Sequence, residues 1–98
     1  MQIHFTGRNL EVTPSLKTFT EEKVTRLVKR NQKITNIYFT FDVDKKMHHA
    51  EAHFHVNGMD IHAVASAEDM HTAIDKLIDR LIVQLTKIKE KSKDHREE

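Results

Sequence analysis

Cysteine is absent from this sequence of 98 residues. Without cysteine there is no disulfide framework, no thiolate nucleophile and no cysteine-ligated zinc site, so packing alone must hold the fold. Glycine occurs only twice; one residue fits a strand end and the other a hairpin, which leaves none for a glycine-rich phosphate loop. No Ser/His/Asp order and no HExxH pattern is present. We therefore expect a protein that is not an enzyme and that binds no cofactor.

Long apolar runs are also missing, since no stretch approaches the roughly 20 residues that span a bilayer. The first residues, Met1–Phe5, lack the basic start and apolar run of a signal peptide. We therefore expect a cytoplasmic protein without membrane contact. A hydrophobic content of 38% in 98 residues suffices for one core and one domain. The formal net charge is only +1 although 32% of residues are charged, so only the arrangement of charges can indicate a polyanionic partner.

Apolar and polar residues alternate in the first half of the chain at two places. Residues 2–6 and residues 35–44 each show the alternation of a half-buried strand. Between them, Thr13 offers an N-cap hydroxyl and Pro14 a first helical residue whose φ is already helical. The pattern predicts a helix from Pro14 to about Asn31.

Residues 50–56 are predicted to form a third strand. A hairpin follows it, because Asn57-Gly58 separates two alternating runs and suits a type I′ turn. A two-residue loop fixes the register: it pairs Val56 with Met59, Phe54 with Ile61, Ala52 with Ala63 and Ala50 with Ala65. One face of this hairpin is apolar, and the other carries His53, His55, Asp60 and His62.

The last element is a long amphipathic helix, with Ser66 and Asp69 predicted to form a capping box before it. Its apolar stripe consists of Met70, Ala73, Ile74, Leu77, Ile78, Leu81, Leu85 and Ile88. A strand, a helix and a strand of these lengths imply a right-handed crossover that makes strands one and two parallel, and we expect an antiparallel meander to follow. The predicted fold class is α+β, of β-α-β-β-β-α order, with a four-stranded mixed sheet and two helices packed on one face. Residues 1–91 form the domain, and residues 92–98 are expected to be a disordered charged tail.

Charge is sorted around the two predicted helices. On the last helix Lys76, Arg80, Lys87 and Lys91 recur at spacings of four, seven and four and share one flank, while Asp75 and Asp79 lie on another. On the first helix Lys23, Arg26, Lys29 and Arg30 gather along one edge. Two basic flanks on neighbouring helices are what an RNA phosphate backbone requires. The alternative is that these lysines only solvate the helices.

The histidines suggest two other hypotheses. His53 and His55 share a strand face and His62 pairs across from His53, which could suit zinc or nickel. Histidines that bind a metal normally lie in a closed site, where the other ring nitrogen donates to an ordered hydrogen-bond partner. An open sheet face disfavours a metal site, so we expect no metal. The other alternative is a protein-interaction module in which this sheet face, with Tyr38, docks a partner without RNA.

Three stretches resemble the ribosome hibernation factor family, which includes the hibernation promoting factors and ribosome-associated inhibitor A. They are Ile3, Thr6-Gly7 and Glu11-Val12-Thr13 with Leu16; His55-Val56-Asn57-Gly58 with Ile61-His62-Ala63; and Asp69-Met70, Ala73-Ile74-Asp75, Leu77, Arg80-Leu81, Gln84-Leu85, Lys87 and Lys89. The resemblance spans nearly the whole chain and is closest to the short-form hibernation promoting factors. It implies a fold similar to double-stranded-RNA-binding domains, and binding in the decoding channel of the small ribosomal subunit, on 16S rRNA, where messenger RNA and the A- and P-site transfer RNAs would lie.

The resemblance also implies site residues and partners. The basic positions of the family correspond to Arg80, Lys87 and Lys89, with Lys91 beside them. Where the family usually has tyrosine and arginine, this chain has His71 and Val83. By analogy the protein inhibits translation, is monomeric when free, binds no DNA, and promotes inactive ribosome dimers together with ribosome modulation factor. We expect the short form, because the sequence given lacks the long form's dimerisation domain and the acidic tail of ribosome-associated inhibitor A.

Overall fold

The computed structural model describes the backbone of residues 1–97 and the side chains of residues 1–88. In chain order the elements are β1 (Gln2–Arg8), α1 (Pro14–Arg30), β2 (Asn36–Asp44), β3 (Met47–Val56), β4 (Met59–Ala67) and α2 (Met70–Glu97). The sheet has the order β1-β2-β3-β4, with β1 parallel to β2 and the other neighbours antiparallel. The predicted fold class is confirmed, and β1 and β4 are the two edge strands.

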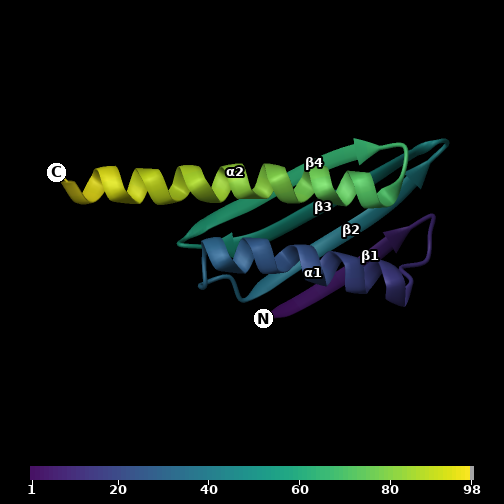
Figure 1. Cartoon of the computed structure of the whole chain (residues 1–98), viewed down its shortest axis with the longest axis horizontal. Helices are drawn as coiled ribbons and strands as arrows, with labels where there is room; N and C mark the ends of the chain where they lie inside the picture. Colours follow the sequence, from purple (N-terminus) through teal and green to yellow (C-terminus); the bar gives the residue numbers. More distant parts are fainter. Residues whose placement is uncertain (98) are drawn as a thin grey trace.

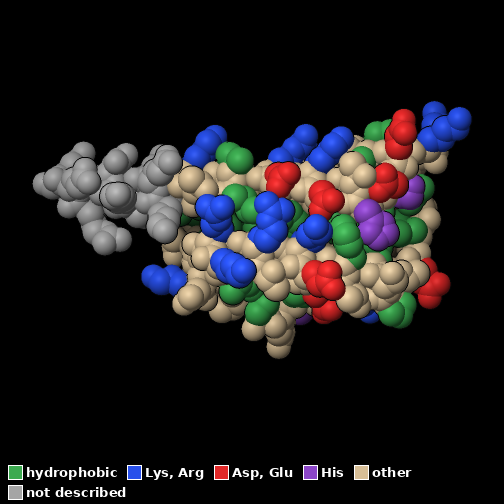
Figure 2. All heavy atoms as spheres, viewed as in Figure 1, with side chains coloured by type: hydrophobic (Ala, Val, Ile, Leu, Met, Phe, Trp, Pro, Cys, Tyr) green, Lys and Arg blue, Asp and Glu red, His purple; other side chains and the backbone are tan. Residues whose placement is uncertain are grey.

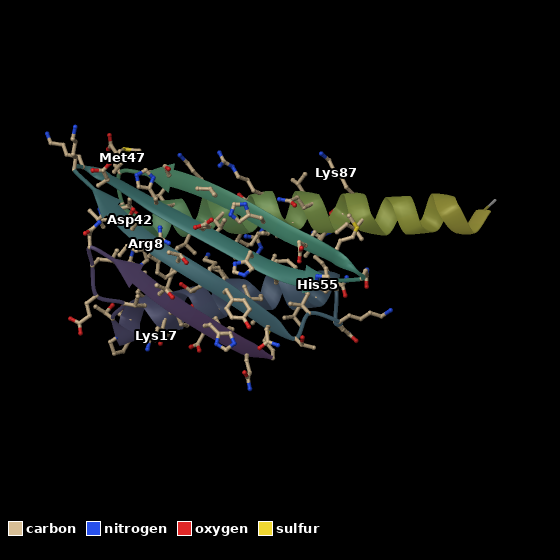
Figure 3. All side chains as sticks on the ribbon, turned by 180° about the vertical axis from the view of Figure 1, so that it is seen from behind. Arg8, Lys17, Asp42, Met47, His55 and Lys87 are labelled. Atoms are coloured by element: carbon tan, nitrogen blue, oxygen red, sulfur yellow. The ribbon has the colours of Figure 1, made fainter. Side chains whose placement is uncertain are left out.

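Both helices lie on the same face of the sheet (Figure 1). Alternate strand residues point to that face, among them Ile37, Phe39 and Phe41, whose side chains are almost completely buried. All eight residues predicted for the apolar stripe of the last helix are buried in the same hydrophobic core. The opposite face of the sheet is covered by no described element (Figure 3). The fold therefore leaves two surfaces for partners, the helices and the open sheet face.

The two helices begin with side-chain caps, one of them at an unexpected residue. Thr13 Oγ1 accepts a hydrogen bond from the Leu16 backbone N–H at 3.2 Å, as predicted. For α2 the cap is Asp69, whose carboxylate accepts from the backbone N–H and from the hydroxyl of Thr72, both at 2.8 Å. The predicted role of Ser66 is wrong because Ser66 still belongs to β4, where its hydroxyl lies 2.6 Å from His49 Nδ1.

The hairpin register predicted between β3 and β4 is confirmed at all four pairs. The antiparallel pairing of β2 with β3 agrees with the predicted meander, but its tight turn was not predicted: β2 and β3 are joined by the two residues Lys45 and Lys46, and Asp44 pairs with Met47. Lys45 has a φ of 57°, a left-handed conformation that is uncommon for a residue other than glycine, asparagine or aspartate. As a result β3 begins at Met47, three residues before the predicted start at Ala50.

The last helix, as bounded above, includes residues 92–97, for which the sequence predicts a disordered tail. The division into a domain of residues 1–91 and a tail of residues 92–98 stays a prediction.

Candidate nucleic-acid interface

The acidic flank of α2 faces α1. Asp75 Oδ1 lies 3.2 Å from Lys23 Nζ, and Asp79 Oδ1 lies 3.2 Å from an Arg26 guanidinium nitrogen. All four side chains are substantially exposed to solvent, so each pair contributes only about 0–1 kcal/mol to stability. Their effect on charge is larger, because two of the four basic residues predicted for α1 already have a carboxylate partner.

The basic flank of α2 faces the other way, toward the edge strand β4. Lys76 Nζ lies 3.5 Å from the Ser66 carbonyl oxygen, Arg80 donates to the Val64 carbonyl, and Gln84 Nε2 donates to the His62 carbonyl at 2.8 Å. We call this row, Lys76, Arg80 and Gln84 together with the β4 backbone from His62 to Ser66, the α2–β4 seam.

The seam forms because four residues of α2 and two residues of β4 cover nearly the same distance along their axes. Four residues of an α-helix advance about 6 Å at ~1.5 Å per residue, and two residues of an antiparallel strand advance about 6.8 Å at ~3.4 Å per residue. The helix runs back along β4 (Figure 1), so each step of four along α2 meets a step of two along the strand. The carbonyls of alternate residues on an edge strand point outward and need donors, which α2 supplies.

Two further exposed residues lie on this flank, one basic and one apolar. Lys87 points away from the sheet (Figure 3) and its side chain is exposed. Val83 is 53% exposed, as its position beside Arg80 and Lys87 predicts. Among residues 1–88, no carboxylate lies within salt-bridge distance of Lys76, Arg80 or Lys87. Figure 2 shows the outcome on the helix face: two rows of basic side chains with acidic side chains between them.

The other predicted site residues fall into two groups. Lys29 and Arg30 are exposed in the last turn of α1. Lys89 and Lys91 lie outside the residues whose side chains are described. Gln84 was not among the predicted site residues, because a neutral amide carries no charge signal. Its spacing of four from Arg80 was the available clue.

The open sheet face carries a row of rings. His4, Tyr38 and His53 stack across β1, β2 and β3 with centroids 4.5 Å and 4.9 Å apart. His62 is in register with His53, as predicted, but its Nε2 is hydrogen-bonded to Glu51. In the described part of the chain, no three or more His, Asp or Glu side chains gather as a metal site would require. Nor does any described helix combine the length and the hydropathy of a membrane span.

Comparison with known proteins identifies the family. Residues 3–93 match the family described as Sigma 54 modulation protein / S30EA ribosomal protein. Ribosome hibernation promoting factors from Klebsiella oxytoca and Escherichia coli (strain K12) are each 44% identical, over 97% of this chain and 100% of theirs. A ribosomal subunit interface protein from Coxiella burnetii superposes with a TM-score of 0.87 at 32% identity, over 92% of this chain and 99% of that one. The N-terminal domain of Thermus thermophilus Protein Y gives 0.82 at 28% identity, over 90% and 99%. This chain belongs to the Sigma 54 modulation protein / S30EA ribosomal protein family.

Proposed function

We propose that this chain is a cytoplasmic ribosome hibernation factor that binds 16S rRNA in the decoding channel of the small ribosomal subunit. There it occupies the space of messenger RNA and of the A- and P-site transfer RNAs. It inhibits translation without chemistry, and it promotes inactive ribosome dimers together with ribosome modulation factor.

The observation that carries the proposal is the basic flank of α2, as far as its side chains are described. Lys76, Arg80 and Lys87 present three positive charges without a carboxylate partner among the described residues, although the net charge of the whole chain is only +1. A row of cations releases the counterions of an RNA backbone and adds affinity that does not depend on sequence. The likeness to ribosome hibernation promoting factors over 97% of the chain supports ribosomal RNA as the polyanion.

The other basic residues have secondary roles in this proposal. Lys29 and Arg30, at the end of α1, contact the same RNA at its margin. Lys89 and Lys91 are further RNA contacts in this proposal, because the family resemblance assigns a basic position to Lys89 and Lys91 is near it in sequence. Lys23 and Arg26 contribute less, because Asp75 and Asp79 offset their charge.

Co-sedimentation with intact ribosomes and with separated subunits tests the proposal. The protein should pellet with the small subunit at low salt and dissociate steeply as salt rises, since the logarithm of affinity falls by roughly 0.7–0.9 per phosphate contact for each tenfold rise in salt. Absence from the small-subunit fraction at low salt contradicts the proposal. Translation assays and sucrose gradients, each with and without ribosome modulation factor, separate inhibition from dimer formation.

A protein-docking role for the open sheet face is the second candidate. Tyr38 and Val64 are each 42% exposed there, on a face that no described element covers. Docking on such a mixed polar and apolar face should depend weakly on salt, so a flat salt titration with ribosomes would favour this function instead.

A further inference from the structure

The backbone of β4 has a second set of groups at the seam, its amide N–H groups. In an antiparallel sheet, the N–H and C=O of one residue point to the same side of the strand. The carbonyls of His62, Val64 and Ser66 point outward, because α2 side chains donate to them. The N–H groups of these three residues therefore also point outward, and none of the described hydrogen bonds uses them.

The seam consequently offers donors and almost no acceptors. Its outward carbonyls are occupied, whereas the ammonium of Lys76 and the guanidinium of Arg80 have more N–H groups than their carbonyl contacts use. An additional peptide strand would need both free N–H and free C=O groups along this edge. A ligand that carries only hydrogen-bond acceptors can bind to the free N–H donors of the seam without any free carbonyl. A phosphodiester backbone is such a ligand, since its oxygens accept hydrogen bonds and carry negative charge.

We propose that the α2–β4 seam holds one strand of the RNA backbone, with Gln84 and the edge amides of β4 as contacts beside Lys76 and Arg80. This inference rests on the proposed function and assigns its main contact to the β4 side of α2 rather than to the groove between the helices. The carbonyl contacts hold the Lys76, Arg80 and Gln84 side chains along the strand before RNA arrives. Less side-chain freedom is then lost on binding.

The position of the acidic residues agrees with this assignment. An RNA strand lying between α1 and α2 would pass Asp75 and Asp79, whose carboxylates repel phosphate. A strand on the β4 side meets Lys76, Arg80 and Lys87, none of which has a described carboxylate within salt-bridge distance. Glu51 and Asp60 lie on the open face, and both are hydrogen-bonded to histidines.

The substitution Gln84→Glu tests the seam, with Gln2→Glu as the matched control. Gln84→Glu places a negative acceptor in the donor row, whereas Gln2→Glu makes the same chemical change on β1, at the opposite edge of the sheet. The glutamate offsets one positive charge of the row, and loss of one such charge contact with phosphate at about 0.1 M salt lowers affinity about sixfold and reduces the salt slope by roughly 0.7–0.9. We expect this of Gln84→Glu in small-subunit binding, and less than about a twofold change for Gln2→Glu. Gln84→Lys keeps a donor and should bind at least as tightly as the unmodified chain.

Hydrogen exchange gives a second readout that a purely structural role of Gln84 would not produce. Bound RNA should slow exchange of the His62, Val64 and Ser66 amides, whereas the amides of residues 61, 63 and 65 are already protected by β3. Equal weakening by the two glutamate variants, or unchanged exchange in residues 59–67 on the subunit, overturns the seam while leaving ribosome binding intact. Failure of the unmodified protein to bind the small subunit at low salt overturns the proposed function and the seam with it.

Discussion

Two pairs of basic residues carry the same charge in different surroundings, which allows a matched test. Lys23 and Arg26 face carboxylates of α2, whereas Arg80 and Lys87 have none within salt-bridge distance among the described residues. Replacing either pair by glutamate removes two positive charges and adds two negative ones, so the formal net charge falls from +1 to −3 in both variants. Long-range repulsion of RNA is therefore similar, and the difference between the variants measures local contacts.

The variant with Arg80→Glu and Lys87→Glu should lose two phosphate contacts. At about 0.1 M salt this corresponds to an affinity loss of about 25- to 60-fold and a salt slope smaller by roughly 1.4–1.8. The variant with Lys23→Glu and Arg26→Glu should lose less than about tenfold, because the charges that it removes were already offset.

Stability separates contact loss from unfolding. Arg80→Glu removes the hydrogen bond to the Val64 carbonyl, which costs about 0.5–1.5 kcal/mol, more than the sequence alone predicts for a surface position. The Lys23 and Arg26 replacements break two surface pairs worth about 0–1 kcal/mol each and place glutamate against aspartate. The two variants should therefore be similarly destabilised in urea denaturation, which makes the second variant a strict control.

The assay is a small-subunit binding titration of both variants at two salt concentrations, with translation inhibition measured in parallel. Retained inhibition by the Arg80 and Lys87 variant would refute the reasoning. So would a larger affinity loss in the Lys23 and Arg26 variant, since it would place the RNA between the helices.

Three further predictions follow from single side chains. Val83→Arg should tighten small-subunit binding and steepen its salt dependence by about 0.7–0.9; weaker binding at both low and high salt would mean that Val83 packs against a neighbour. Phe54→Ala, at a side chain that is 2% exposed, should lower the free energy of unfolding by about 3–5 kcal/mol in urea melts, and a loss below about 1 kcal/mol would count against its core position. Hydrogen bonds from the Thr72 backbone N–H, and then from its hydroxyl, lower the pKa of Asp69, so its ionised form stabilises the fold above pH ~4 and this contribution disappears as pH falls through the lowered pKa. Asp69→Ala should therefore lower the melting temperature at pH 7, with a gap to the unmodified protein that closes in acid; a gap independent of pH would refute the cap.

Burial patterns made most of the fold predictable. Alternation set the buried face of β2 and the register after Asn57-Gly58, because a one-residue slip would turn every core side chain of β4 to solvent. The stripe from Met70 to Ile88 placed α2, since only one helical face offers that much apolar surface.

The sequence did not predict backbone details that depend on contacts between residues distant in sequence. The Lys45-Lys46 turn contains no glycine or asparagine, the residues that usually indicate such a turn in a sequence. The pairing of β2 with β3 holds Lys45 in its left-handed backbone conformation. Gly7 looked like a strand end but lies inside β1, where a Cβ atom would come 2.5 Å from the Leu10 carbonyl oxygen. That close approach depends on how the loop after β1 folds back, which no local pattern encodes.

The candidate site was also only partly predictable from the sequence, because its contacts depend on residues distant in sequence. Helical spacing sorted the charges of α2 into an acidic and a basic flank, but it could not say which flank meets which neighbour. The answer depends on where the apolar stripe seats the helix, between α1 on one side and the edge of β4 on the other. Once seated, α2 uses Asp75 and Asp79 to hold α1 and the opposite flank to close the β4 edge. The same α2 side chains therefore have two roles. They cover the exposed edge of β4 by donating to its outward carbonyls, and they present N–H donors to an RNA backbone that lies along this edge. A substitution there should affect RNA affinity and edge protection together, whereas a substitution at Lys29 or Arg30 should affect affinity alone.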